Sequence, residues 1–435
     1  MPVFNWFSRA TLVAISISVT ACAWSQNGKS ATKAGSDAGG AVSIGAVRPG
    51  NLVLPQISIQ IGGDAAAGQV IQGDLQLADI ASAPTNGAAA ADAAAKDRQA
   101  QQGIDYNAWT AAGVSYVLRG VVNGASGQAE LYDVASHQRV FGKNYQNAGD
   151  ARRLAHKISD DAMLAISGAP GIFSSRIALL TGAASGKREV AVMDADGGNL
   201  AVLTSENAIV ATPAWGRNGN EIFFTSYRDN NPDLYAISLN RQRSPVSRRP
   251  GLNTSPSWSQ AAQRLALTLS KDGNSEIYTM NADGTGLARL TQNSAADTAP
   301  AWSPDGSQIA FTSDDTGMPE IYVMGANGSG RRKVSPGGYC DSPAWSPDGQ
   351  KLAYVKRENG GFNIYVLDLK SGNNSRITNG GDNFEPSWAP NSRHLVFASN
   401  RSGRNLFLVN TQTKQAKQLT KQGTFSSPEW GPVLP

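Results

Sequence analysis

Short runs of alternating apolar and other side chains dominate the C-terminal part of the chain. Examples lie at 308–312 (QIAFT), 320–324 (EIYVM) and 351–355 (KLAYV). Runs of this length with β-branched and aromatic residues indicate β-strands. Turn sequences separate them, as in the Ser-Pro-Asp-Gly segments at 303–306 and 346–349, where Pro presets the backbone of a type I turn. The pattern therefore predicts many short strands joined by tight turns.

These strands belong to a repeat marked by the triplet Pro-x-Trp. The triplet occurs six times with its Trp residues 42 to 44 positions apart, at 213–215, 256–258, 300–302, 343–345, 386–388 and 428–430. Each period has room for four short strands, which is the size of one β-propeller blade. Residues 176–209 supply three strands without a triplet, and the last triplet has no strands after it. Joining the two completes a sixth blade, so we expect a six-bladed β-propeller over 170–435 that is closed by the C-terminal strand.

The segment 41–169 lacks the repeat and predicts a small α/β domain. Strands are expected at 52–61 and 114–122, and a hairpin-like pair at 129–133 and 140–145. One apolar face at 150–166 predicts a helix. The Ala-rich stretch 88–100 is compatible with a helix or a loop. GAPG at 168–171 ends the helix and marks the domain boundary. The predicted fold class is therefore mainly β, a six-bladed β-propeller preceded by a small α/β domain.

The N-terminus has the features of an export signal at 1–22. Residues 11–21 (TLVAISISVTA) form an apolar run of h-region length, too short to span a bilayer. The run ends at Val19-Thr20-Ala21-Cys22, which resembles a lipoprotein box with Cys22 as the lipidated residue. Ordinary cleavage after Ala23 is the second interpretation. The Gly/Ser/Ala-rich residues 23–40 read as a flexible linker, so we expect a periplasmic protein that Cys22 anchors to a membrane if it is lipidated.

Composition argues against several classes of site. The three His and two Cys residues are not at metal-ligand spacing, so we expect no metal and no cofactor. The net charge is only +4, and no Lys/Arg block resembles a nucleic-acid footprint. No Gly-x-Ser-x-Gly elbow is present for a hydrolase domain. We therefore expect a non-enzymatic binding protein that does not bind nucleic acid.

The strand order of a propeller predicts where binding takes place. The loop before each Pro-x-Trp strand and the loop between the second and third strands emerge on one face, around the axis. Variable loops on a constant scaffold are typical of a binding surface. The candidate partner-binding residues are Thr254, Asp297, Asp341, Glu385 and Ser427 in the first set of loops, and Arg228, Arg357 and Arg401 in the second.

Several motifs together resemble the TolB family, the periplasmic β-propeller proteins of the Tol–Pal system. They are the repeat Pro-Ala-Trp-Ser-Pro-Asp-Gly, Gly73-Asp74-Leu75, the segment 109–120 (WTAAGVSYVLRG), and 173–178 (FSSRIA). The likeness extends from about residue 41 to the C-terminus. The low-complexity segment 23–40 differs from the family's TolA-binding N-terminus.

The resemblance implies a non-enzymatic function in the cell envelope. The expected partners are a Pal-like peptidoglycan-associated lipoprotein and a TolA-like inner-membrane protein. The expected roles are outer-membrane integrity, constriction at cell division and bacteriocin import, and we expect a monomer. Two alternatives remain open: an envelope propeller that binds a small molecule or glycan, and a propeller hydrolase that uses axial carboxylates.

Overall fold

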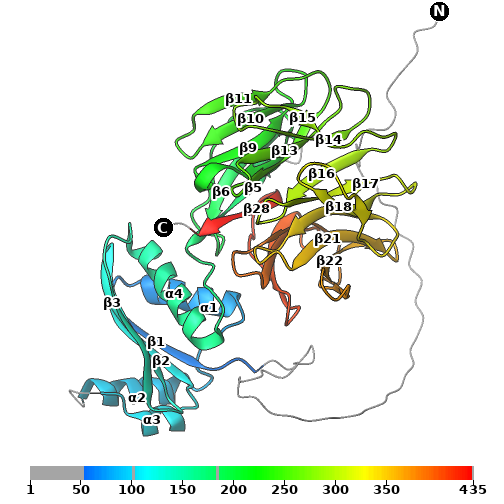
Figure 1. The fold of residues 1–435 in the computed structure, drawn as a ribbon. Helices are drawn as coiled ribbons and strands as arrows, with labels where there is room; N and C mark the ends of the chain where they lie inside the picture. The colour runs from blue at the N-terminus through cyan, green and yellow to red at the C-terminus, as the bar shows by residue number, and fades with distance from the viewer. Residues whose placement is uncertain (1–52, 100–102, 183–185, 434–435) are drawn as a thin grey trace, which may run out of the picture. The chain divides into compact units, whose positions relative to one another are not determined.

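The computed structural model describes residues 53–99, 103–182 and 186–433 (Figure 1). Val47–Pro435 form one compact unit. The predicted signal peptide 1–22, its candidate lipidation site Cys22 and the linker 23–40 lie outside the described residues. Within the described part, no helix combines the length and apolarity needed to cross a membrane.

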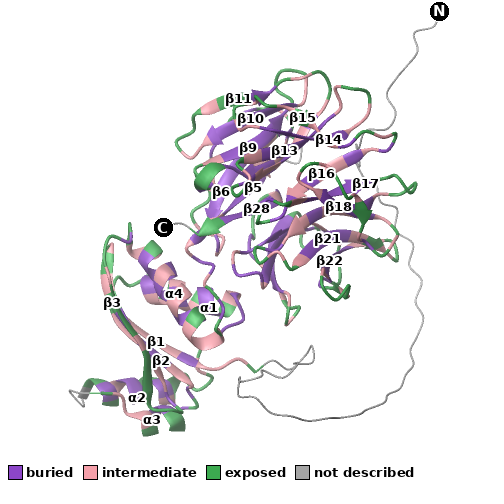
Figure 2. Cartoon of the chain, viewed as in Figure 1, coloured by how far each residue is buried: buried purple, intermediate pink, exposed green. Residues whose placement is uncertain are grey.

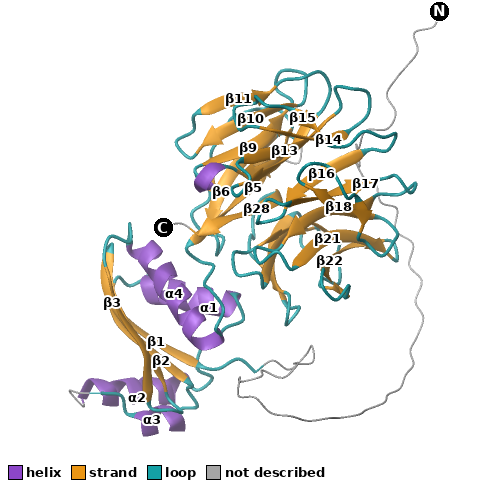
Figure 3. Cartoon of the chain, in the orientation of Figure 1, coloured by secondary structure: helices purple, strands orange, loops and turns teal. Residues whose placement is uncertain are grey.

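The N-terminal part is a four-stranded sheet with helices on both faces (Figure 3). Its strands follow the order β1 (Ile57–Gly63), β2 (Tyr116–Asn123), β3 (Ser126–Asp133) and β4 (Gln138–Tyr145), with only β1 and β2 parallel. The helices are α1 (Ala67–Leu77), α2 (Gly87–Gln99), α3 (Tyr106–Ala111) and α4 (Ala151–Ser167). One core joins the sheet to α1 and α4, and a second joins it to α2 and α3. Thus the Ala-rich stretch is a helix, and α1 is a helix that the sequence pattern did not predict.

Capping residues, Asp150 and Gly168, define the two ends of helix α4. The Asp150 carboxylate accepts a hydrogen bond from the backbone N–H of Arg153 at 2.8 Å, which satisfies one of the free N–H groups of the first turn. Gly168 terminates the helix in the left-handed conformation, with φ of 67°. Leu154, Ile158 and Ala162 recur at helical spacing and are fully buried. This face fixes α4 between the sheet and the propeller.

The remainder is a six-bladed β-propeller, as predicted. Each blade is a four-stranded antiparallel sheet. From the inner strand outward, the first blade is β28 (Phe425–Val433), β5 (Ser175–Gly182), β6 (Arg188–Asp194) and β7 (Ala201–Val202), and the second is β8 (Val210–Trp215), β9 (Glu221–Ser226), β10 (Asp233–Ser238) and β11 (Arg243–Ser247). The third is β12 (Asn253–Ser259), β13 (Arg264–Leu269), β14 (Glu276–Met280) and β15 (Ala288–Arg289), and the fourth is β16 (Asp297–Trp302), β17 (Gln308–Ser313), β18 (Glu320–Gly325) and β19 (Arg332–Lys333). The fifth is β20 (Cys340–Trp345), β21 (Lys351–Glu358), β22 (Gly361–Asp368) and β23 (Asn374–Arg376), and the sixth is β24 (Asn383–Trp388), β25 (His394–Ser399), β26 (Asn405–Asn410) and β27 (Ala416–Gln418). A short 3₁₀ turn, η1 (Arg217–Gly219), follows β8.

The ring closes through pairing of the C-terminal strand with the first blade. β28 pairs antiparallel with β5, with Phe425 opposite Thr181 and Trp430 opposite Ile177. The six inner strands contact one another in sequence around the circle. The prediction that the last triplet completes the first blade is therefore confirmed.

The repeated Trp residues connect blades as well as filling them. Trp430 is 6% exposed, and its indole N–H donates to Ser175 Oγ at 2.7 Å. The indole N–H of Trp215 donates to the carbonyl of Glu429 in the neighbouring blade at 2.9 Å. Trp302 and Trp388 are likewise buried, whereas Trp258 and Trp345 are half-buried. A buried indole combines a large apolar surface with one directed hydrogen bond, so Trp215 and Trp430 stabilise the closed ring. The indole N–H groups of Trp302 and Trp345 have no hydrogen-bond partner among the described residues.

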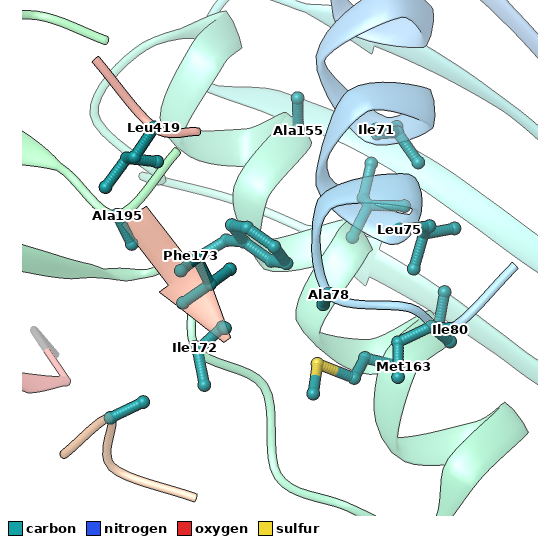
Figure 4. Close-up of a cluster of buried hydrophobic side chains, with 14 of the residues drawn as sticks. Ile71, Leu75, Ala78, Ile80, Ala155, Met163, Ile172, Phe173, Ala195 and Leu419 are labelled. Atoms are coloured by element: carbon teal, nitrogen blue, oxygen red, sulfur yellow. The ribbon is translucent and has the colours of Figure 1, made fainter. Parts of the chain in front are cut away.

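One apolar core runs from the N-terminal sheet into the propeller. It includes Ile71 and Leu75 of α1, Phe173 before β5, Ala195 after β6, and Leu419. Figure 4 shows Phe173 beside α4 and the propeller strands. Figure 2 shows buried residues on the strands of the blades and on the N-terminal sheet and its helices. Because one cluster contains residues from both parts, burial of apolar surface holds them together.

Each inner strand contains a β-bulge at the residue before its proline. The strand register shifts there in all six inner strands. The six bulge residues have φ between 48° and 57°, which L-residues rarely adopt. They are Thr212, Ser255, Ala299, Ser342, Glu385 and Ser427. The bulges thus place one strained residue in each of the six inner strands.

We predict that Trp430→Ala lowers the free energy of unfolding by about 3–5 kcal/mol, the usual loss for a buried Trp. Trp258→Ala is the matched control and should cost less, because Trp258 is only half-buried. Urea denaturation followed by circular dichroism measures both. Equal losses would contradict the role of Trp430 in ring closure.

We also predict that Ala299→Gly raises the free energy of unfolding by about 0.5–1 kcal/mol, because Gly adopts positive φ without strain. Ala301→Gly lies in the same strand but outside the positive-φ region, and should lower it by roughly 0.5–1 kcal/mol. Thermal unfolding of both variants tests the assignment. A loss of stability in both would contradict strain at the bulge.

Candidate partner-binding face

The strand register places two sets of loops on the same side of the propeller. Asn253, at the start of β12, pairs with Leu269 at the end of β13. The loop before the inner strand and the loop after the second strand therefore leave the blade at the same end. Asp297 and Ser313 have the same relationship in the next blade. We call this side the axial face, and define it by the loops 227–232, 248–252, 270–275, 290–296, 314–319, 334–339, 359–360, 377–382, 400–404 and 419–424.

The five candidates before the triplets occupy three different positions of the bulge. Glu385 and Ser427 are bulge residues, directly before the proline. Thr254 and Asp341 lie one residue earlier, and Asp297 lies two residues earlier. The sequence interpretation grouped all five only by their place before Pro-x-Trp, although their distance from the proline differs by up to two residues. They are not equivalent side chains around the ring.

Asp297 lies inside the protein instead of on the surface of the axial face. Its side chain is fully buried, and Asn293 Nδ2 donates to its Oδ2 at 2.8 Å. Burial raises the pKa of Asp297, although hydrogen bonds from Ser313 and Asn293 and the positive charge of Arg331 partly oppose that effect. A side chain in this position supports the loop, and it has no surface to offer a partner.

The other four side chains are half-buried and link neighbouring inner strands or blades. Ser427 donates from both its backbone N–H and its hydroxyl to the Glu385 carboxylate, at 2.6 and 2.8 Å. Thr312 Oγ1 donates to Asp341 Oδ1 at 2.9 Å. The hydroxyls of Thr254 and Thr212 lie 3.3 Å apart. These hydrogen bonds stabilise the rim of the axial opening.

The three candidate arginines differ in their freedom to reach a partner. Arg228 and Arg357 are exposed. Arg401 is half-buried, donates to Asn383 Oδ1 at 2.6 Å and to Ser399 Oγ at 3.1 Å, and lies 4.8 Å from the centre of the Phe407 ring. Hence Arg228 and Arg357 are available on the surface, whereas Arg401 is committed to internal contacts.

The axial face also carries an aromatic cluster, formed by Tyr339, Phe362 and Phe384. The ring centres of Phe362 and Phe384 are 5.0 Å apart, and those of Tyr339 and Phe362 are 5.7 Å apart in an edge-to-face arrangement. The Arg357 guanidinium lies 5.8 Å from the centre of the Phe362 ring. All three aromatic rings are only half-buried. The cluster therefore presents apolar surface beside a positive charge.

Sequence reasoning did not identify Phe362, since the pattern placed it inside an ordinary strand. The feature that could have pointed to Phe362 is the length of the hairpin formed by β21 and β22. β21 and β22 have eight residues each, whereas the corresponding strands of the other blades have five to eight, and only two residues separate β21 from β22. The extra length extends this hairpin on the axial face and carries Phe362 with it.

One group in the described residues has the composition of a metal site, but both carboxylate oxygens of one member, Asp196, already accept hydrogen bonds. Single ligand atoms of Asp74, His156 and Asp196 lie within 4.8 Å of one another. However, Asp196 Oδ1 accepts from the Gly198 N–H at 2.9 Å, and its Oδ2 accepts from Arg152. A metal ion would have to displace Arg152, so we interpret the group as a charge network.

One cavity in the described part of the chain bears on the glycan alternative. It has a volume of about 330 Å³, lies between the fifth and sixth blades and is lined by Asp348, Lys351, Arg393 and Lys414 among others, without an aromatic residue. Sugar-binding sites commonly present an aromatic platform for stacking, so this cavity gives that alternative no support, whereas the aromatic cluster on the axial face is compatible with it.

Comparison with known proteins agrees with this architecture. The family model described as the TolB beta propeller domain matches residues 164–434, and that of the TolB amino-terminal domain matches residues 49–140. The crystal structure of TolB from Acinetobacter baumannii is similar with a TM-score of 0.78 and 26% identity, covering 87% of this chain and 96% of that one.

Curated relatives match over a shorter stretch. The Tol-Pal system protein TolB of Desulfosudis oleivorans is 35% identical over 195 residues, 44% of each chain. That of Anaeromyxobacter dehalogenans is 36% identical over 176 residues, 40% of each chain. The matched stretches thus span less than half the length of these relatives. The propeller model alone covers more than half of the chain, and the chain therefore belongs to the TolB family.

Proposed function

We propose that this chain is a non-enzymatic, protein-binding component of a Tol–Pal system in the periplasm, and that its axial face binds a Pal-like lipoprotein. The observation that carries the proposal is the aromatic cluster with Arg357 on the extended β21–β22 hairpin. Aromatic residues and Arg supply most of the binding energy in protein interfaces. Half-buried rings on a rigid hairpin lose little entropy when a partner covers them.

The charges around the cluster suit a polar protein surface. Arg228 and Arg357 are exposed on the axial face, and Asp341 and Glu385 lie at its rim. Mixed charge of this kind provides orientation and specificity to a protein complex. It does not form the continuous basic stripe expected of a nucleic-acid interface.

The geometry at the rim supports binding over catalysis. Glu385 accepts two hydrogen bonds from Ser427, and Asp341 accepts one from Thr312. Carboxylates held in this way act as structural acceptors. A general acid or base needs a carboxyl that is directed at a substrate, and the hydrolase alternative therefore has less support.

The remaining parts of the proposal follow from family membership. A TolA-like inner-membrane protein is the second partner, and lipidation of Cys22 would add a membrane anchor. The system would support outer-membrane integrity and constriction at division, and bacteriocins would use it for import. We propose a monomer that consists of an α/β domain over 41–169 and the propeller over 170–435.

We predict that Phe362→Ala and Arg357→Ala each weaken binding of a purified Pal-like soluble domain about tenfold or more, the loss expected for an interface hot spot. Arg332→Ala is the matched control, because Arg332 is exposed on the outermost strand β19. Calorimetric titration of each variant gives the dissociation constants.

Three outcomes separate the parts of the proposal. Binding by the unaltered protein and the Arg332 variant, with loss in the other two, supports both partner and face. Binding that all variants retain equally would overturn the face and leave the partner intact. No binding by the unaltered protein would overturn the Pal-like partner.

A further inference from the structure

Two buried histidines lie where the N-terminal part packs against the propeller, and they differ in what surrounds them. His394 belongs to β25, and its Nε2–H donates to the carbonyl of Ala78, directly after α1, at 3.0 Å. His156 belongs to α4 and faces Asp194, the last residue of β6. We call this region the seam, and define it by α1, α4, β5, β6, the turn after β6, and β25.

His394 is suited to remain neutral. Its Nδ1 accepts from Asn391 Nδ2 at 3.0 Å while its Nε2–H donates to Ala78, so that both ring nitrogens are satisfied without a second proton. Burial lowers the pKa of His394 to about 4. This histidine is a pH-independent contact near neutrality.

His156 has the opposite environment. Its Nδ1 lies 2.8 Å from Asp74 Oδ2, which also accepts from Ser159 Oγ at 2.6 Å. The imidazole stacks on the Phe173 ring, 6.2 Å between ring centres, and is 2% exposed. Burial opposes charge on His156, but the hydrogen bond and negative charge of Asp74 and the charge of Asp196 outweigh it and raise the pKa of His156.

The second ring nitrogen of His156 points to the propeller. Nε2 has no hydrogen-bond partner among the described residues, and Asp194 Oδ2 lies 3.9 Å from it. Because the bond to Asp74 places a proton on Nδ1, neutral His156 presents a lone pair at Nε2 to the Asp194 carboxylate, which is a repulsive contact. Protonation at Nε2 presents an N–H to the same carboxylate, which is an attractive one.

The charged groups around His156 come from every element that packs against it. α1 contributes Asp74, α4 contributes Arg152 and Asp160, β5 contributes Arg176, and β6 with its following turn contributes Asp194 and Asp196. Arg152 donates to Asp194 at 3.2 Å and to Asp196, and so already connects α4 with the propeller. The carboxylates outnumber the arginines, and this excess of negative charge favours a cationic His156.

We propose that His156 is a proton-controlled latch between the α/β domain and the propeller: a proton on Nε2 attracts Asp194 and tightens the seam, and its loss loosens the seam. The proposal does not depend on the partner that the axial face binds. It gives the protein a device by which the acidity of its surroundings sets how firmly its two parts are joined.

The direction of the effect follows from linkage. A histidine whose folded pKa is raised contributes stability that is fully present below the unfolded value of 6.5 and is lost as the pH rises through the folded value. The latch therefore weakens above pH 6.5. Burial raises the pKa of Asp74 to about 6, so Asp74 takes up its proton below this window.

The first test is an NMR titration of the imidazole signals of the full chain in the presence of EDTA, from about pH 5.5 to 9. The chain has only three histidines, and single substitutions of His137 and His394 assign the signals. We expect His156 to titrate above 6.5. Asp194→Asn should reduce the ratio of protonated to neutral His156 at pH 7 by at least about fivefold, because it removes a facing charge. Asp315→Asn, exposed elsewhere on the propeller, is the matched control and should leave the ratio unchanged.

The second test measures the seam directly. Spin labels at Ala91→Cys in α2 and Lys370→Cys in the propeller, in a Cys22→Ser background, report the distribution of distances between the two parts by pulsed electron paramagnetic resonance. We expect a narrower distribution at pH 7.0 than at pH 8.5. The response should be lost in His156→Gln. If that buried substitution prevents folding, Asp194→Asn takes its place and should likewise lose the response.

Each of the following results would overturn the proposal. One is titration of His156 at or below 6.5, or titration that Asp194→Asn does not change. Another is a distance distribution that does not change between the two pH values. A pH response that is seen without EDTA and is abolished by it would assign the effect to a bound metal ion instead.

Discussion

The pairing of β28 with β5 is the constraint on which the rest of the molecule depends. A propeller blade has only its neighbours to cover its two faces, so a ring with one incomplete blade leaves apolar surface and free strand edges exposed. In this chain the missing inner strand comes from the far end of the sequence, and Trp430 packs beside Ser175 and donates a hydrogen bond to it. Residues more than 240 positions apart therefore form one sheet, and the closed arrangement of the six blades depends on this pairing.

The closed ring also gives the axial face its rigidity. The six bulge residues are held at positive φ, a conformation that persists only where the surroundings enforce it. Neighbouring inner strands supply that enforcement through contacts such as Ser427 with Glu385. A rigid rim lets the extended β21–β22 hairpin present its aromatic rings in a fixed geometry, which lowers the entropy cost of the partner binding that we propose for this face.

The seam shows how two histidines with similar burial acquire different chemistry. His394 has a neutral donor and a carbonyl acceptor as partners, and burial is the largest influence on its pKa and keeps it neutral. His156 has the Asp74 carboxylate at Nδ1 and the Asp194 carboxylate facing Nε2. Burial opposes its charge, but the hydrogen bond and charge of Asp74 and the charge of Asp196 outweigh burial and raise the pKa of His156. The contact between His394 and the Ala78 carbonyl does not change with pH near neutrality. The contact between His156 Nε2 and Asp194 depends on whether Nε2 carries a proton.

The sequence predicted the features that repeat and missed those that occur once. Six Pro-x-Trp triplets at nearly constant spacing were sufficient for the blade count and for closure. The buried Asp297 lies three residues before its proline and the half-buried Asp341 lies two before. The repeat alone did not show which of these positions faces inward, because the bulge changes side-chain direction within one or two residues. Helix α1 was missed since its Ala, Gly and Gln residues give a weak pattern, and the pairing of Asp74 with His156 joins residues 82 positions apart that no local pattern connects.

Ring closure by the last strand has a consequence for how the chain is delivered. Segments emerge from the ribosome in order, and domains generally fold as their residues become available. The first blade cannot be completed until β28 has emerged, so the propeller as a whole remains unfinished throughout synthesis. An unfinished ring keeps part of the propeller from reaching its final packing, which suits the passage across a membrane that our proposal of a periplasmic protein implies, and β28 then completes the ring.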